Sequence, residues 1–195
     1  MNEIPLVLLI IFSAFSMNLT LQCALGIREI AESKSFDFFS TLIKLSVIFA
    51  AVVLLWLFFS KIITLLISGF FIFVLLFPVS YMAYEGLEFL VFNKILKRET
   101  AKEGTISFPG GITAAAVFIC MNIANNFIQT AMLSFGFVLG TFLVFMIIGV
   151  IRRRAALEAV PRFLRGKPLV LISMGMLSLV FSTASLLLFR VIGAR

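Results

Sequence analysis

The feature that most constrains this 195-residue chain is a series of apolar runs, several of them long enough to cross a bilayer as a helix. Roughly 18 or more residues of low charge span the hydrocarbon core of a membrane. Here 62% of the residues are hydrophobic and only 13% are charged, and the ten-residue alternation of an outer-membrane barrel is absent. We therefore predict an all-α integral membrane protein.

The apolar runs predict six transmembrane helices. Pro78 is expected to kink the third of them. The first run follows the acidic Glu3 with no basic residue before it, so we expect a retained span rather than a cleaved signal peptide. The predicted spans cover residues Ile4–Ile27, Phe38–Phe59, Gly69–Phe92, Ile112–Ile128, Thr130–Ile151 and Leu169–Phe189.

Basic residues are distributed unevenly between the connections of a six-span chain. Of the sixteen lysines and arginines, two follow the first span, four follow the third and six follow the fifth, all on one side of the membrane. The other side holds three, and Lys44 lies inside the second span. The positive-inside rule places the basic side in the cytoplasm and both termini outside it. The net charge of +7 therefore reflects membrane topology and contact with lipid headgroups, and we predict no nucleic-acid partner.

Amide side chains interrupt the first and fourth apolar runs. Asn18 interrupts the first, and Asn122 interrupts the fourth together with Asn125 and Asn126, which would share its face of a helix. Because amides in hydrocarbon need hydrogen-bond partners, we predict that helices one and four are broken. The alternative interpretation is that each asparagine merely hydrogen-bonds a neighbouring helix.

The two interruptions also predict an internal repeat, because the sequence MNL at 17–19 is echoed by MNI at 121–123. Three crossings invert the chain, so two such halves face opposite ways, as in transport proteins whose broken helices meet near the midplane. We predict a first three-helix repeat over 1–92, a cytoplasmic connection over 93–108 and a second, inverted three-helix repeat over 109–195.

The third run holds the only carboxylates at membrane depth. Glu88 and Glu85 share a polar helical stripe with two tyrosines. An intramembrane carboxylate is costly enough to be presumed functional. We therefore predict an ion pathway formed by Glu88, Asn18 and Asn122. The alternative is that Glu88 reaches the interface and pairs there with a basic residue such as Lys94.

The two cysteines, Cys23 and Cys120, both fall inside hydrophobic runs, where a buried apolar thiol is the default. The chain has no histidine, which excludes haem or a histidine-ligated metal held by this chain alone.

The C-terminal half resembles the Rnf/Nqr membrane subunits, specifically the RnfA/NqrE side of that paralogous pair. The resemblance is carried by Phe127–Ser182, through a Phe-Gly-x-x-x-Gly span, an Ile-Arg turn, Val-Pro-x-x-Leu-Arg-Gly and a helix with Gly-x-x-x-Leu-x-Phe. These motif residues are Phe135, Gly136, Gly140, Ile151, Arg152, Val160, Pro161, Leu164, Arg165, Gly166, Gly175, Leu179 and Phe181. Weaker similarity extends upstream.

The resemblance implies the same six-helix inverted repeat and a role in a bacterial or archaeal cytoplasmic-membrane complex. Such a complex passes electrons between NADH or ferredoxin and a second carrier and couples this to Na⁺ or H⁺ movement. The partners implied are a paralogous subunit of inverted topology, similar to RnfE/NqrD, and flavin-bearing subunits. The chain would then be one subunit of a translocase, without catalysis of its own.

The resemblance also implies a [2Fe-2S] cluster clasped between the paralogs, each giving one cysteine from span one and one from span four. Here Arg28 and Ala116 stand at the positions that align with those cysteines. Cys23 and Cys120 lie in the correct spans but are displaced by five and four residues. They are either two of the four ligands that a cluster needs or inert thiols in a diverged subunit.

Three functional hypotheses follow. The first is the redox-driven ion-translocating subunit just described. The second is a small inverted-repeat carrier that binds a solute or cation without redox partners. The third is a helical scaffold with no transport role, for which changes at Glu88 and Asn122 would leave the activity of the complex unaltered.

Overall fold

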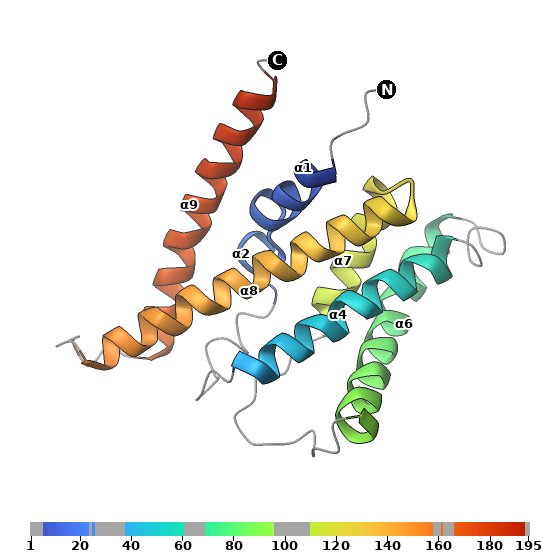
Figure 1. Ribbon diagram of the computed structural model, residues 1–195, viewed down its shortest axis with the longest axis horizontal. Helices are drawn as coiled ribbons and strands as arrows, with labels where there is room; N and C mark the ends of the chain where they lie inside the picture. Colours follow the sequence, from blue (N-terminus) through green and yellow to red (C-terminus); the bar gives the residue numbers. More distant parts are fainter. Residues whose placement is uncertain are drawn as a thin grey trace.

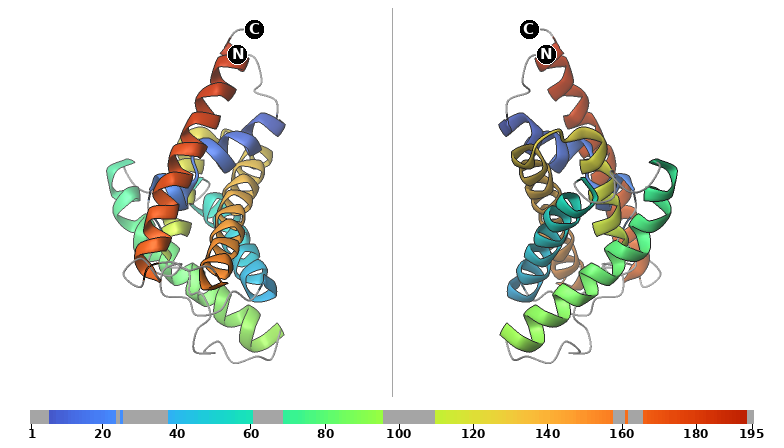
Figure 2. Two further views of the ribbon diagram at one scale, coloured as in Figure 1. Left: turned by 90° about the vertical axis from the view of Figure 1, so that its left-hand side faces the viewer. Right: turned by 90° about the vertical axis from the view of Figure 1, so that its right-hand side faces the viewer.

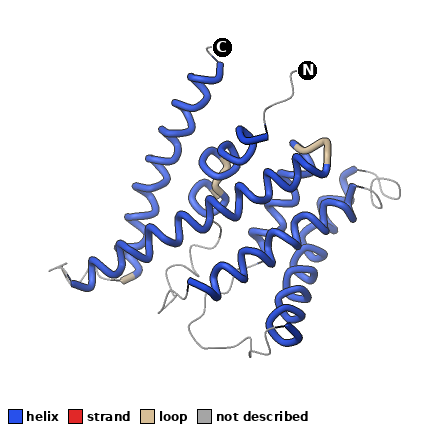
Figure 3. Tube along the Cα trace, in the orientation of Figure 1, coloured by secondary structure: helices blue, strands red, loops and turns tan. Residues whose placement is uncertain are grey.

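The computed structural model describes residues 6–23, 25, 38–60, 69–95, 110–157, 161 and 166–193, and every regular element within them is helical (Figures 1 and 3). The predicted all-α class is therefore confirmed. In chain order the elements are α1 (Leu6–Ile11), the π-helical η1 (Phe12–Ser16), α2 (Leu19–Gln22), α4 (Phe38–Phe58), α6 (Gly69–Phe89), the π-helical η3 (Leu90–Ile95), α7 (Gly110–Ile123), α8 (Phe127–Leu157) and α9 (Lys167–Gly193).

Three helices in the described part of the chain are long and apolar enough to cross a membrane. They are Phe39–Phe58, Phe127–Ala155 and Lys167–Leu187. Two shorter apolar stretches, Leu6–Gln22 and Gly111–Ile123, accompany them. The chain is thus a multi-pass membrane protein, as its composition predicts.

The fifth predicted span is longer in the structure than in the sequence analysis. Helix α8 begins at Phe127 rather than Thr130 and continues to Leu157, so that the three arginines after Ile151 extend the helix instead of forming a turn. Arginine, alanine and leucine are all strong helix formers, so nothing in that stretch ends the helix. Pro78 lies inside α6, whose helical assignment runs across it.

Helices α4 and α8 pack against each other at the centre of the molecule (Figures 1 and 2). On one side of them α7 packs against α6 and α4. On the other side the first span, made of α1, η1 and α2, packs against α8 and α9. The first helix of each predicted half therefore contacts the second and third helices of the other half.

The closest approach in this arrangement lies between α8 and the first span. A Cβ atom at Gly140 would lie 2.5 Å from the carbonyl oxygen of Ala14 and 3.0 Å from its Cα atom. A Cβ atom at Gly136 would lie 2.6 Å from the carbonyl oxygen of Ile10 and would overlap the hydroxyl of Ser13. The Gly-x-x-x-Gly spacing thus permits the close helix contact expected of small residues in a membrane.

Candidate functional site

The first span is broken at Asn18, as predicted. Helix η1 ends at Ser16, Asn18 has extended backbone angles (φ −64°, ψ 108°), and α2 begins at Leu19. The amide oxygen of Asn18 accepts hydrogen bonds from the backbone N–H groups of Thr20 (3.1 Å) and Leu21 (3.2 Å).

The amide nitrogen of Asn18 donates to the carbonyl oxygen of Ala14 at 3.1 Å. One buried side chain therefore satisfies backbone groups on both sides of the break, in a region where water is not available to do so. These three hydrogen bonds hold the break, and the role of Asn18 in an ion pathway stays a prediction.

The predicted break in the fourth span is wrong. Helix α7 runs without interruption from Gly110 to Ile123, and Ala124–Asn126 form the turn into α8. Asn122 is exposed and donates to the carbonyl oxygen of Phe118 in its own helix at 2.8 Å. The backbone N–H of Asn125 donates to the side chain of Gln129 at 2.9 Å. Consecutive asparagines favour turns because their amides bond local backbone, and here they end a helix instead of splitting one.

The predicted polar stripe of the third span divides into a buried and an exposed part. Ser80, Tyr84 and Glu88 follow one another at i, i+4 and i+8 and face the interior, while Tyr81 and Glu85, each one residue further along the chain, are exposed. Successive helical residues point about 100° apart, so only one ridge of the stripe can face the neighbouring helices.

Glu88 forms an ion pair with Lys44 of α4. The carboxylate oxygen Oε1 lies 3.2 Å from the ammonium nitrogen Nζ, and the two side chains are 15% and 4% exposed. Among the described residues, Glu88 is thus paired with a basic residue of another helix. Breaking a buried pair by removing one partner typically costs about 3–5 kcal/mol, because the other charge is left uncompensated.

Sequence reasoning missed this pairing, although the signal was present. Lys44 is the only basic residue inside a predicted span, and Glu88 and Glu85 are the only carboxylates there. Charged residues within membranes usually pair with one another. Two isolated opposite charges on adjacent spans are therefore a reasonable prediction of a pair.

A small cavity of about 10 Å³ lies where α2, α4, α7 and α8 meet. A cavity of this size holds at most about one water molecule. The hydroxyl of Ser134 is buried there and has no hydrogen-bond partner in the described part of the chain, while the hydroxyls of Thr20 and Thr141 lie 3.4 Å apart. The lining residues are Leu19, Leu45, Ile48, Val52, Ile112, Ala116, Ser134, Phe137, Val138 and Thr141.

The two cysteines lie in different surroundings in the structure. Cys120 is completely buried in the hydrophobic core of this chain, whereas Cys23 is exposed at the end of α2. The predicted role of these two thiols as ligands of a shared cluster stays a prediction. Ala116, which aligns with a family cysteine, is also buried by its own chain, and Arg28 lies outside the described residues. Among the described residues, no group of three or more potential metal ligands gathers in one place.

Comparison with known proteins gives a partial likeness. Over 61 residues the chain is 38% identical to the RnfA subunit of the ion-translocating oxidoreductase complex of Escherichia coli O1:K1 / APEC and to that of Escherichia coli K12 / DH10B. It is 36% identical over the same length to the corresponding protein of Actinobacillus pleuropneumoniae serotype 5b. No family model matches the chain.

The matched segment is 31% of this chain and 32% of each of these relatives, so the chain spans about a third of the length of the curated relatives it matches. The likeness is to subunits of a membrane complex, in agreement with the all-helical, apolar structure.

Proposed function

We propose that this chain is a membrane subunit of an Rnf-type complex that couples electron transfer to the movement of Na⁺ or H⁺. The observation that carries the proposal is the 61-residue similarity to the RnfA subunits of ion-translocating oxidoreductase complexes. The broken first span and the buried ion pair between α4 and α6 support it, because both are typical of transport proteins. The donor side would be NADH or ferredoxin, served by other subunits.

The proposed inverted repeat is supported by packing relations that recur when the two halves are exchanged. The third helix of the first half, α6, packs on α7, and the third helix of the second half, α9, packs on η1. Likewise α4 packs on α7 while α8 packs on α1, and the central α4–α8 contact maps onto itself. Residues 1–92 and 109–195 are the proposed halves.

A shared burial pattern in α4 and α8 supports the same repeat. When the first residues of these helices, Phe38 and Phe127, are aligned, buried positions coincide along both helices. The coinciding pairs are Thr41/Thr130, Lys44/Leu133, Leu45/Ser134, Val47/Gly136, Ile48/Phe137, Ala51/Gly140, Val52/Thr141, Leu55/Val144, Trp56/Phe145 and Phe59/Ile148. Equivalent faces of the two helices are therefore covered, as an exchange of halves requires.

Of the three residues predicted for an ion pathway, Glu88 is the one that the geometry favours. Asn18 is committed to backbone hydrogen bonds, and Asn122 lies exposed at the end of α7. Glu88 is a carboxylate in the interior, and we place the proposed ion site there together with Lys44. Electrons are not routed through Cys23 or Cys120 in this proposal.

The proposed partners are a paralogous subunit of inverted topology and flavin-bearing subunits, in a bacterial or archaeal cytoplasmic membrane. The start of α1 and the end of α9 lie toward the same end of the molecule, which supports an even number of crossings with both termini on one side (Figure 2). In this proposal that side faces away from the cytoplasm, which the uneven distribution of basic residues supports.

Affinity purification tests this proposal. The chain carries a C-terminal tag in its native membrane, and the purified material is examined for co-migrating subunits, flavin, iron and EPR signals. We expect a paralog and flavin-bearing subunits, and the same iron content with Cys23→Ala and Cys120→Ala as without them. A chain that purifies alone, while an equally tagged known complex subunit retains its partners, overturns the proposal.

The alternative function is a carrier that works without redox partners. The small central cavity holds at most about one water molecule, but an apolar cavity of about 420 Å³ lies between α4 and α8. Uptake of a solute by the isolated chain in liposomes would favour that alternative.

A further inference from the structure

We infer that the ammonium group of Lys44 occupies a monovalent-cation site at Glu88 and prevents free cations from binding to that carboxylate. The inference deepens the proposed function, since it rests on Glu88 being the ion site and names what controls it. It applies to the purified chain whether or not partner subunits are present.

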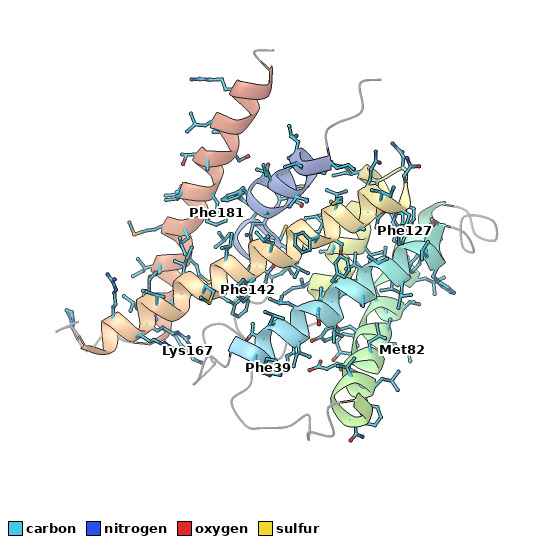
Figure 4. The ribbon with its side chains drawn as sticks, in the orientation of Figure 1. Phe39, Met82, Phe127, Phe142, Lys167 and Phe181 are labelled. Carbon is cyan, nitrogen blue, oxygen red and sulfur yellow. The ribbon has the colours of Figure 1, made fainter. Side chains whose placement is uncertain are left out.

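The first step is the geometry of the pair. Glu88 Oε1 faces Lys44 Nζ at 3.2 Å, a separation close to that of a charge-assisted hydrogen bond, and the lysine side chain is only 4% exposed. The carboxylate thus receives a full positive charge from within the chain. Figure 4 shows the side chains that lie between α4 and α6. In that view Phe39 marks the start of α4, and Met82 lies on the side of α6 that faces away from α4.

The second step is that the fold does not need this pair. In the proposed repeat, Leu133 of α8 stands at the position of Lys44 in α4, and both are buried. Helix α9, the counterpart of α6, has no acidic residue between Lys167 and Gly193, although it too packs against its neighbour α8. Buried ion pairs can usually be replaced by packed hydrophobic residues without loss of stability. The second half of the proposed repeat thus packs without an ion pair at this place.

The third step is competition. A group tethered beside its partner acts at an effective concentration in the millimolar range or above, so a free monovalent cation must displace Lys44 before it can bind. When the ammonium is removed, the carboxylate is left buried without a counter-charge, which is costly unless a cation or proton takes its place. Loss of Lys44 should therefore open a cation site that the native chain keeps closed.

The experiment measures binding of ²²Na⁺ to purified chain at neutral pH, with choline chloride holding ionic strength constant. We expect no saturable binding to the native chain, saturable binding to Lys44→Met that approaches one ion per chain, and loss of that binding in the double variant Lys44→Met/Glu88→Gln. Lys44→Arg keeps a tethered cation and should bind as little Na⁺ as the native chain.

Two results would overturn the inference. One is that Lys44→Met binds no more Na⁺ than the native chain, and the other is that the binding persists after Glu88→Gln. Should Lys44→Met fail to fold, Lys44→Gln, which is uncharged but polar, carries the same expectation. Co-purification of redox subunits does not depend on Na⁺ binding by Lys44→Met, so a failure here is distinguishable from a failure of the proposed function.

Discussion

The contact between α8 and the first span makes a strong prediction about Gly140. Replacing it with alanine adds one methyl group at the place where the two backbones are closest. The new Cβ atom would lie 2.5 Å from the carbonyl oxygen of Ala14, 3.0 Å from the Cα atom of Ala14 and 2.9 Å from the amide nitrogen of Asn18. Two of these three atoms belong to the backbone and cannot rotate away.

The magnitude follows from the distances. Ordinary contact begins at 3.4 Å, so the shortest distance must grow by 0.9 Å, the difference between 3.4 and 2.5 Å, which requires α8 and η1 to separate. Overpacking of this kind costs about 1–3 kcal/mol. Displacement of Asn18 weakens the cap of α2, which adds about 1 kcal/mol. We expect Gly140→Ala to lower the free energy of unfolding by about 2–4 kcal/mol.

Thermal unfolding in detergent, followed by the fluorescence of the single tryptophan, Trp56, measures this effect. For a chain of this length each kcal/mol corresponds to about 2–4 °C, so Tm should fall by roughly 4–16 °C. Gly175→Ala in α9 is the matched control, because a Cβ atom there meets nothing within 4 Å. Since alanine favours helix over glycine, this control should leave Tm unchanged or raise it slightly.

A Tm for Gly140→Ala within about 2 °C of that for Gly175→Ala would refute the reasoning, because less than about 1 kcal/mol would then separate a crowded glycine from an open one. The first span would in that case be free to move away from α8.

Three further predictions follow from the same structure. Asn18→Ala leaves the start of α2 uncapped, so it should lower the free energy of unfolding, measured by chemical denaturation, by about 1–2 kcal/mol. The control Asn122→Ala should lower it by less than about 0.5 kcal/mol. Equal losses of stability in the two variants would contradict the break at Asn18. In a Cys23→Ser chain, a maleimide dye should label Cys120 only as the protein unfolds, and labelling of the folded chain would contradict the burial of that thiol. Alkaline phosphatase fused to the C-terminus should be active and green fluorescent protein fused there dark if the basic connections face the cytoplasm, as we propose; the reverse pattern would invert the proposed topology.

Local sequence rules were sufficient where a feature depends on a single stretch of chain. The break at Asn18 follows from one polar residue in an apolar run. The same rule failed at Asn122, since its surroundings differ. Apolar residues resume directly after Asn18, but Asn122 is followed within four residues by two consecutive asparagines, which end the helix.

Features that depend on two distant stretches were not predicted. Lys44 and Glu88 lie on different helices, and only the packing of α4 against α6 brings them together. The polar stripe of α6 was predicted as one face, and the choice of the ridge through Tyr84 and Glu88 as its buried part is made by the neighbouring helices. A periodic pattern defines a face of a helix but does not say which neighbour covers it.

The two proposed halves share a pattern of burial but achieve close packing differently. In the second half the small residues lie on α8, where Gly136 and Gly140 meet the backbone of the broken first span. In α4 the aligned positions hold Val47 and Ala51, and its partner α7 is an unbroken helix that carries the alanines Ala114–Ala116. Ala116 lines the same central cavity as three residues of α4.

Close approach of membrane helices needs small side chains on at least one of the two surfaces. The broken first span presents backbone carbonyls to α8, as at Ala14, so that only glycine fits opposite. The unbroken α7 instead supplies alanines, which relieves α4 of the need for glycine and leaves its buried face free to carry larger or charged side chains. Lys44 lies on that face. An unbroken α7 and a buried charge on α4 thus occur together in the structure, and both distinguish the packing of α4 from that of α8.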